Sequence, residues 1–334
     1  MILGREVRIL READVRAALD MAACIDACER AFAQYSGGGA ETPDVISLGV
    51  PEHHGSVHVK AGHLHKQPYF AVKVASGFPD NIDLGLPTND GLVLVLDAVT
   101  GAPAAFLLDN GFITDLRTGA AGGVAARHLA KDQVWNVAVI GSGAQTRYQL
   151  DALAVVRPGF TRVRLWGRNP QRAAAAVADL RERPGLPEDC VFEVATDVRT
   201  AVEGADVVIT ATAARSPLVR GEWLSEGVHI TAVGADEQDK QELETAVIAR
   251  ADILAVDSRK QCAAFGELHH ALSAGLVKES KAVELGQICS GAEKGRTAGH
   301  QLTVCDLTGL GVQDVAAANV VMANAEGLGE VVKI

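Results

Sequence analysis

A glycine-rich stretch near the middle of the chain has the residue types and spacing of a nucleotide-binding turn. Residues 137–140 (VAVI) form a short apolar run, Gly141-Ser142-Gly143 make a tight turn, and helical spacing begins at about Ala144. Glycines at such a turn let the backbone approach a pyrophosphate, whose charge the N–H groups of the following helix offset. Thr146 stands near the place of the third glycine of this pattern. The expected contacts of a dinucleotide in this stretch are Gly141, Ser142, Gly143, Ala144 and Gln145.

The residues after the next predicted strand, 162–166, bear on the choice between NAD and NADP. The acid that usually binds the ribose 2′-OH is absent, and Gly167-Arg168-Asn169 stands there, with Arg172 a turn later. Two arginines could accept a 2′-phosphate, but this sequence does not exclude NAD, because Arg168 could stack on adenine instead. We therefore expect NAD or NADP as cofactor. Its expected contacts outside the glycine turn are Thr118, Arg168, Asn169 and Arg172.

Two basic residues in the first part of the chain could bind an anionic substrate. Lys73 shares a predicted strand face with Ala71 and Ala75, which leave room beside an ammonium group. An edge-strand lysine that guards against aggregation is the alternative. Arg117 is expected in the first turn of a helix that Thr114 or Asp115 would cap. A cation is unfavourable in the first turn of a helix, so a bound carboxylate or cofactor phosphate would explain an arginine at this position. The alternative is an arginine that simply lies on the surface.

Asp236 lies just past the predicted strand 229–233, in the segment VGAD. Doubly wound folds bind ligands at the carboxyl ends of their parallel strands, so this position favours a catalytic acid. The alternative is an aspartate that only forms a turn.

Histidines and cysteines do not predict a metal site. Five histidines gather between residues 53 and 65, but no HExxH-like helix frames them and no acidic co-ligand beyond Glu52 stands among them. The six cysteines are scattered, so we expect free thiols rather than disulfides or metal ligands.

Composition favours a two-domain α/β enzyme with a small-molecule substrate. The chain has 334 residues, of which 48% are hydrophobic and only 4% aromatic, as suits close packing of helices on sheets. The net charge is −11 without a basic run, so we expect neither nucleic acid nor an anionic membrane as partner. No apolar stretch reaches about 18 residues and the amino terminus lacks a signal-peptide core, which indicates a cytoplasmic protein.

The order of the predicted elements separates the two domains. Short alternating segments over 45–108 predict an antiparallel or mixed sheet, preceded by a strand and two helices. After a helix at 115–130, strands alternate with helices in a Rossmann-like pattern, and a last helix covers 312–325. That tail could pack on the first domain, which would leave the nucleotide domain as a middle insert.

Five segments resemble the ornithine cyclodeaminase/μ-crystallin family, in matching order over nearly the whole chain. They are YFAVKVASGFPDN, TDLRTGAAGGVAARHLA, VAVIGSGAQ, VGADEQDKQEL and CDLTGLGVQD. The resemblance implies a homodimer with a substrate-binding and dimerisation domain of mixed α+β structure (1–129 with 309–334) and a Rossmann-like domain (130–308). It also implies that Lys73 and Arg117 bind the substrate carboxylate and that Asp236 acts as acid and base.

One departure from the family suggests the substrate. Ornithine cyclodeaminases have a glutamate for the distal amine thirteen residues before the active-site lysine, where this chain has Lys60. The reversed charge would repel an ammonium group and attract a second carboxylate. We therefore expect reduction of a dicarboxylic imine such as iminosuccinate, giving aspartate, with Lys60 and His58 on the distal carboxylate. The alternative for Lys60 is a side chain that points to solvent.

Other family activities remain open. The same lysine, arginine and aspartate would serve cyclodeamination of ornithine or reduction of a cyclic ketimine such as pyrroline-2-carboxylate. A non-enzymatic binding protein like the crystallin member is a third possibility, against which the presence of all three polar residues argues.

Overall fold

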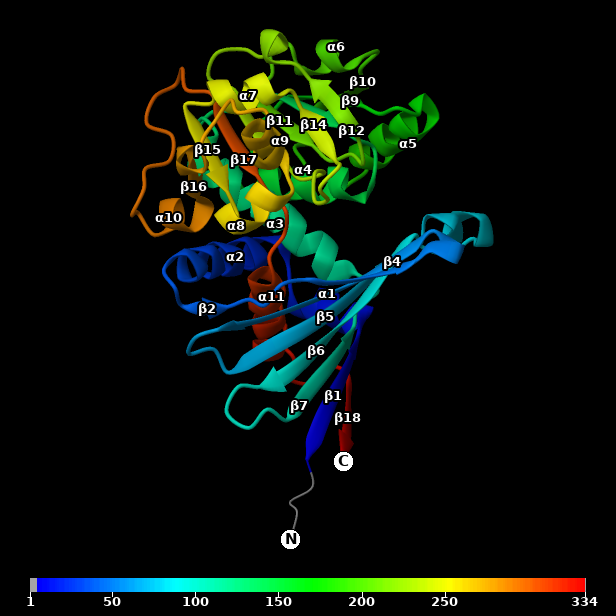
Figure 1. Ribbon diagram of the computed structural model, residues 1–334. Helices are drawn as coiled ribbons and strands as arrows, with labels where there is room; N and C mark the ends of the chain where they lie inside the picture. Colours follow the sequence, from blue (N-terminus) through cyan, green and yellow to red (C-terminus); the bar gives the residue numbers. More distant parts are fainter. Residues whose placement is uncertain (1–4, 334) are drawn as a thin grey trace. The chain divides into compact units, whose positions relative to one another are not determined.

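Two sheets with different strand patterns dominate the computed structural model, which describes residues 5–333 (Figure 1). Contacts divide the chain into two compact units: residues up to Arg117 with those from Leu310 onward, and Thr118–Gly309. The division falls inside helix α3 (Phe112–Leu129), whereas the sequence placed the first boundary at residue 129, after this helix. The start of α3 belongs to the first unit because Arg117 bonds to residues near the C-terminus.

The first unit contains a mixed sheet with strand order β18-β1-β7-β6-β5-β4-β2, in which β3 also pairs with β4. Strands β4 to β7 are antiparallel neighbours, as the alternating segments predict, and β1 joins β7 in parallel. The strands are β1 (Glu6–Arg11), β2 (Ala40–Glu41), β3 (Ile46–Val50), β4 (Gly55–Leu64), β5 (Tyr69–Gly77), β6 (Asn89–Asp97), β7 (Pro103–Leu108) and β18 (Glu330–Lys333).

Three helices pack together on one face of this sheet: α1 (Glu12–Ala18), α2 (Met21–Ser36) and α11 (Gly311–Ala323). Short 3-10 turns η1 (Pro51–His53) and η2 (Pro79–Leu84) complete the unit. Helix α11 crosses β4 closely, because a Cβ on Gly311 would lie 2.5 Å from the carbonyl oxygen of Ala61 and one on Gly62 3.1 Å from Val315. These two glycines therefore let residues of α11 reach the sheet.

Helix α3 begins earlier than the sequence indicates. Asp109 accepts a hydrogen bond from the N–H of Ile113 at 2.6 Å, and the helix starts at Phe112. The expectation that Thr114 or Asp115 caps this helix is therefore wrong. Arg117 consequently lies in the second turn, beyond the first turn in which the helix dipole acts most strongly. The dipole argument for an anionic partner of Arg117 therefore does not apply.

The second unit contains a fully parallel sheet with the order β10-β9-β8-β11-β13-β17-β15-β16. Strand order reverses between β8 and β11, the switch point at which doubly wound sheets bind ligands. Its strands are β8 (Asn136–Ile140), β9 (Arg162–Trp166), β10 (Val191–Val194), β11 (Val207–Thr210), β13 (His229–Ala232), β15 (Ile253–Val256), β16 (Ala282–Glu284) and β17 (Thr303–Asp306), beside a separate parallel pair, β12 (Arg215–Val219) and β14 (Gln241–Leu243).

Apolar clusters cover both faces of this parallel sheet. Along β8, Val137 and Val139 belong to one cluster, whereas Ala138 and Ile140 belong to the other. Burial on both faces explains the continuous apolar run in the sequence. The surrounding helices are α4 (Ala144–Val156), α5 (Pro170–Arg181), α6 (Val198–Val202), α7 (Thr245–Arg250), α8 (Arg259–Ala264), α9 (Glu267–Ser273) and α10 (Leu285–Cys289), with 3-10 turns η3 (Gly221–Trp223) and η4 (Glu279–Lys281).

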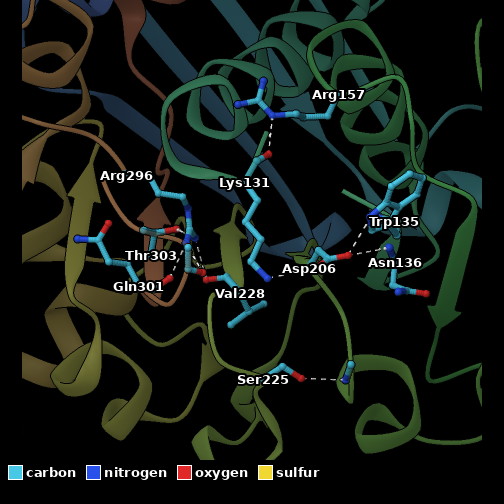
Figure 2. A network of polar contacts seen from close by, with 12 residues as sticks. Lys131, Trp135, Asn136, Arg157, Asp206, Ser225, Val228, Arg296, Gln301 and Thr303 are labelled. Atoms are coloured by element: carbon cyan, nitrogen blue, oxygen red, sulfur yellow. Dashed lines mark hydrogen bonds and ion pairs between the residues drawn. The ribbon is translucent and has the colours of Figure 1, made fainter. Parts of the chain in front are cut away.

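Polar side chains hold the amino ends of the central strands (Figure 2). Asp206, just before β11, accepts hydrogen bonds from the N–H groups of Trp135 and Asn136 at the start of β8. Arg296 donates to the carbonyl oxygen of Val228 and to the hydroxyl of Thr303, at the starts of β13 and β17. These contacts fix the edge of the sheet opposite to the glycine turn.

Two further expectations concern the whole chain. None of the six cysteines forms a disulfide. Among residues 5–333, no helix combines the length and the apolar character that a membrane span requires.

Candidate functional site

The glycine turn stands between β8 and α4, as the sequence predicts. Gly141 has a φ of 133°, and a Cβ there would lie 2.4 Å from the carbonyl oxygen of Ala211. The hydroxyl of Thr146 donates to the carbonyl oxygen of Gly141 at 3.0 Å, so this side chain supports the turn where the usual pattern has a glycine. At Gly143, the residue before α4, a Cβ would meet no atom within 4 Å. The packing of the chain therefore does not require Gly143, whereas close approach of a pyrophosphate would.

The expected 2′-phosphate contacts follow β9. Arg168 and Arg172 are exposed. The side chain of Asn169 accepts the N–H of Arg172 at 2.9 Å and caps α5, which is a structural role that the sequence analysis did not assign. The carbonyl oxygen of Thr118 accepts a hydrogen bond from Gln149 at 2.9 Å.

Asp236 lies in the loop after β13, at the carboxyl edge of the parallel sheet. Its side chain is 52% exposed and pairs with the ammonium group of Lys240 at 2.7 Å. Lys240 also pairs with Glu237 at 3.0 Å. Although burial lowers the pKa of Lys240, these two carboxylates raise it above its ordinary value. Sequence reasoning missed Lys240, although its spacing of four residues from Asp236 was a usable signal.

Glu242 is a buried carboxylate that fixes the loop carrying Asp236. One of its oxygens accepts from the N–H and the hydroxyl of Thr212, at 2.6 and 2.7 Å, and the other accepts from the N–H of Gly234 at 2.9 Å. Thr212 follows β11 and Gly234 follows β13, so Glu242 ties two neighbouring strand ends together. Burial raises the pKa of Glu242. The sequence had no signal for this role, because the contacts depend on which strands are neighbours.

In the first unit, Lys73 and Arg117 share one carboxylate. The ammonium group of Lys73 donates to Oδ1 of Asp314 at 2.9 Å, and Nε of Arg117 donates to the same oxygen at 3.2 Å. All three side chains are buried, and β5 is an interior strand. The edge-strand alternative for Lys73 and the surface alternative for Arg117 are therefore wrong. Sequence reasoning did not select Asp314, although it ends the segment CDLTGLGVQD.

The charges in this cluster alter its proton affinities. Burial, together with the positive charges of Arg117 and Lys60, lowers the pKa of Lys73 to about 7, although Asp314 opposes the shift. Burial alone would raise the pKa of Asp314, but Lys73 and Arg117 bring it below its ordinary value. Burial also raises the pKa of Asp109 to about 6.

Lys60 stands directly opposite Lys73 in the β4–β5 pairing, and His58 stands opposite Ala75. Opposed residues of an antiparallel pair project to the same face, so Lys60, His58 and Lys73 share one face of the sheet. Lys60 is partly buried there. His58 contacts the hydroxyl of Ser47 through Nδ1 at 3.1 Å. The first unit thus brings together the four residues expected to bind carboxylates, whereas the glycine turn and Asp236 belong to the second.

A glycine turn at the switch point of a doubly wound sheet, with an acid at the same edge, is typical of dinucleotide-dependent oxidoreductases. The chain belongs to the ornithine cyclodeaminase/mu-crystallin family, whose model matches residues 5–329. The resemblance seen in the five sequence segments is confirmed.

Solved structures of three relatives share the fold. The iminosuccinate reductase of Paracoccus denitrificans, in complex with NAD+, is 30% identical with a TM-score of 0.89, covering 99% of this chain and 100% of that one. An archaeal alanine dehydrogenase dimer with bound NAD is 33% identical with a TM-score of 0.89 and the same coverage. The Δ1-pyrroline-2-carboxylate reductase of Thermococcus litoralis, with NADH and L-proline, is 31% identical with a TM-score of 0.88, covering 97% and 99%.

Proposed function

We propose that this protein is an NAD(P)H-dependent imine reductase that acts on a small dicarboxylic imino acid, with reduction of iminosuccinate to aspartate as the specific reaction. The observation that carries the proposal is the pairing of Lys60 with Lys73 on one face of the sheet. Arg117 joins Lys73 on a shared carboxylate. Lys73 and Arg117 suit the carboxylate beside the imine, whereas Lys60 and His58 suit a second carboxylate. The likeness to the Paracoccus iminosuccinate reductase adds support.

The glycine turn is suited to NAD or NADP. The open space at Gly143 and the N–H groups at the start of α4 would receive the pyrophosphate. Arg168 and Arg172 are placed after β9, where the adenosine ribose binds in such folds. When bound, the nicotinamide supplies the hydride.

The side chains of the chain hold and polarise the substrate in this mechanism. Lys73 and Arg117 bind the proximal carboxylate, which orients the imine carbon. An imine accepts hydride much better when its nitrogen carries a proton, so Asp236 hydrogen-bonds this nitrogen and stabilises the iminium charge. Lys240 orients Asp236 through their ion pair, and Glu242 fixes the loop.

A panel of substrates tests the reaction. We expect NAD(P)H oxidation with oxaloacetate plus ammonia to have a higher kcat/KM than with pyruvate or glyoxylate plus ammonia, and ornithine to release no ammonia. If oxaloacetate with ammonia is inert while ornithine releases ammonia, the dicarboxylate proposal fails.

A cyclic ketimine is the second candidate substrate. The likeness to the Thermococcus enzyme solved with NADH and L-proline favours it. Pyrroline-2-carboxylate has one carboxylate, so it would engage Lys73 and Arg117 and leave Lys60 without a substrate partner. The same panel separates the two candidates when this imine is included.

The exposed face of the first sheet supports a homodimer. Apolar side chains oppose each other across its strands, as Phe70–Leu96, Val72–Leu94, Val74–Leu92 and Leu94–Phe106. Phe106 is 37% exposed, and a continuous apolar face of this kind usually marks an interface. We expect the wild type to be dimeric and Leu94→Glu monomeric by light scattering. Val99→Glu, at a position 91% exposed in a turn, is the control that should stay dimeric. A dimeric Leu94→Glu variant would contradict this interface.

A further inference from the structure

We propose that Asp314 is a positioning residue for the substrate carboxylate, because it holds the Lys73 and Arg117 side chains together and maintains the positive charge of Lys73. This inference deepens the proposed function and rests on it for the presence of a substrate carboxylate. Asp314 acts through its two partners and need not touch the substrate.

The geometry gives Asp314 control over both cations. Its Oδ1 accepts one hydrogen bond from β5, through Lys73, and another from α3, through Arg117. Gln313 supports the arrangement because its amide donates to the carbonyl oxygen of Arg117 at 3.0 Å. Without the carboxylate, two buried cations would repel each other where water screens them poorly. A carboxylate at this point therefore allows both groups to occupy one site.

The second oxygen of Asp314 distinguishes this role from a structural one. Oδ2 is buried and accepts no hydrogen bond from the residues that the structure describes. An aspartate that served only to attach α11 to the sheet would be expected to satisfy both oxygens. A buried acceptor left unsatisfied costs stability, and proteins tolerate such costs at functional sites.

The surrounding charges make the protonation of Lys73 depend on Asp314. Lys60 faces Lys73 from β4, Arg117 from α3 and Asp314 from α11, and Asp109 lies within electrostatic range. On α2, a hydrogen bond with Cys28 and burial raise the pKa of Cys24 well above its ordinary value, so this thiol stays neutral. Asp314 is thus the carboxylate that raises the pKa of Lys73, which burial and the two cations hold at about 7. Removing the charge of Asp314 would leave Lys73 as a neutral amine at neutral pH.

Asp314→Asn tests the proposal, because it removes the charge and nearly conserves the shape. The measurement is the dissociation constant of succinate and, separately, of pyruvate, with the cofactor-loaded protein between pH 5.5 and 9. For the wild type we expect binding to weaken above about pH 7, as Lys73 loses its proton. For Asp314→Asn we expect this weakening at least one pH unit lower and a dissociation constant at pH 7 raised about tenfold. Glu326→Gln, which removes a charge from an exposed position after α11, should behave as the wild type.

Rescue separates charge from structure. Adding Lys73→Arg to Asp314→Asn should restore binding at pH 7 and remove its pH dependence, because a guanidinium stays charged. An unchanged pH profile in Asp314→Asn would overturn the proposal. If Asp314→Asn does not fold, the double variant Asp314→Asn with Lys73→Met replaces it, because it removes both charges of the ion pair. This double variant should bind succinate and pyruvate weakly at every pH. Binding by this double variant that still weakens near pH 7 would also overturn it.

The two probes distinguish the two proposals. If the protein binds pyruvate but not succinate, while Asp314→Asn shifts the pH profile of pyruvate, the dicarboxylate substrate is wrong and the role of Asp314 stands. If succinate binds and Asp314→Asn leaves the pH profile of succinate binding unchanged, the dicarboxylate substrate stands and the proposed role of Asp314 is wrong.

Discussion

Lys60 and Lys73 lie directly opposite each other on neighbouring antiparallel strands and project to the helix-covered face of the sheet. Like charges in this relationship destabilise a sheet, so a functional reason for the pair is expected. Lys60 belongs to the electrostatic environment of the site, because its charge contributes to lowering the pKa values of both Lys73 and Asp314.

Lys60→Glu should change the substrate preference. The substitution replaces a charge-assisted hydrogen bond by repulsion, so kcat/KM for oxaloacetate with ammonia should fall about 100-fold. The value for pyruvate with ammonia should change less than about threefold, because the distal carboxylate is missing. Lys66→Glu makes the same charge change at an exposed turn and serves as the control. An equal loss with both substrates would show that Lys60 does not discriminate between them.

Asp236→Asn should affect turnover rather than cofactor affinity. Loss of a general acid and base typically lowers kcat by about 10² to 10⁴, whereas NADH binding should change less than about threefold. Glu237→Gln is a matched control, because Glu237 is the neighbouring acid and also pairs with Lys240. Steady-state kinetics with fluorescence titration of NADH provides both quantities. If Asp236→Asn retains wild-type turnover, another group moves the proton.

The two glycines of the turn should respond differently to alanine. Gly141→Ala combines a φ of 133° with a Cβ 2.4 Å from a carbonyl oxygen, so it should lower the free energy of unfolding by about 1–3 kcal/mol or more. Gly143→Ala meets no atom within 4 Å and should leave that free energy within about 1 kcal/mol. Its methyl group should nevertheless weaken NADH binding about tenfold, by blocking the pyrophosphate. Chemical denaturation and NADH titration measure the two effects, and tight NADH binding by Gly143→Ala would argue against a pyrophosphate there.

Arg168→Ser tests how the chain accepts NADPH. If Arg168 binds the 2′-phosphate, its loss should raise the KM of NADPH about tenfold and that of NADH less than threefold. Arg162→Ser removes an arginine that is 54% exposed at the other end of β9, and neither KM should change. A parallel rise of both KM values would indicate stacking on adenine instead.

Local sequence patterns were sufficient for many of the helices and strands and for part of the site. The apolar run, the glycine turn and the helix start of 137–150 are consecutive, so their structure depends on neighbouring residues and could be predicted. Comparison with the family pattern, which has a glutamate thirteen residues before the active-site lysine, also singled out Lys60. The same reasoning misplaced the start of α3, because the carboxylate of Asp109 caps it from outside the expected helix.

Only the tertiary structure revealed the partners of the predicted residues. Asp314 meets Lys73 across 241 positions in sequence, and Glu242 meets Thr212 through the adjacency of two strand ends. No local periodicity encodes such contacts, because they depend on strand order and on where α11 crosses the sheet. The sequence by itself therefore predicted candidate residues for the chemistry, but not the buried partners that hold them. The fold decided which charges lie close enough to change one another, because electrostatic coupling depends on distance and burial rather than on position along the chain.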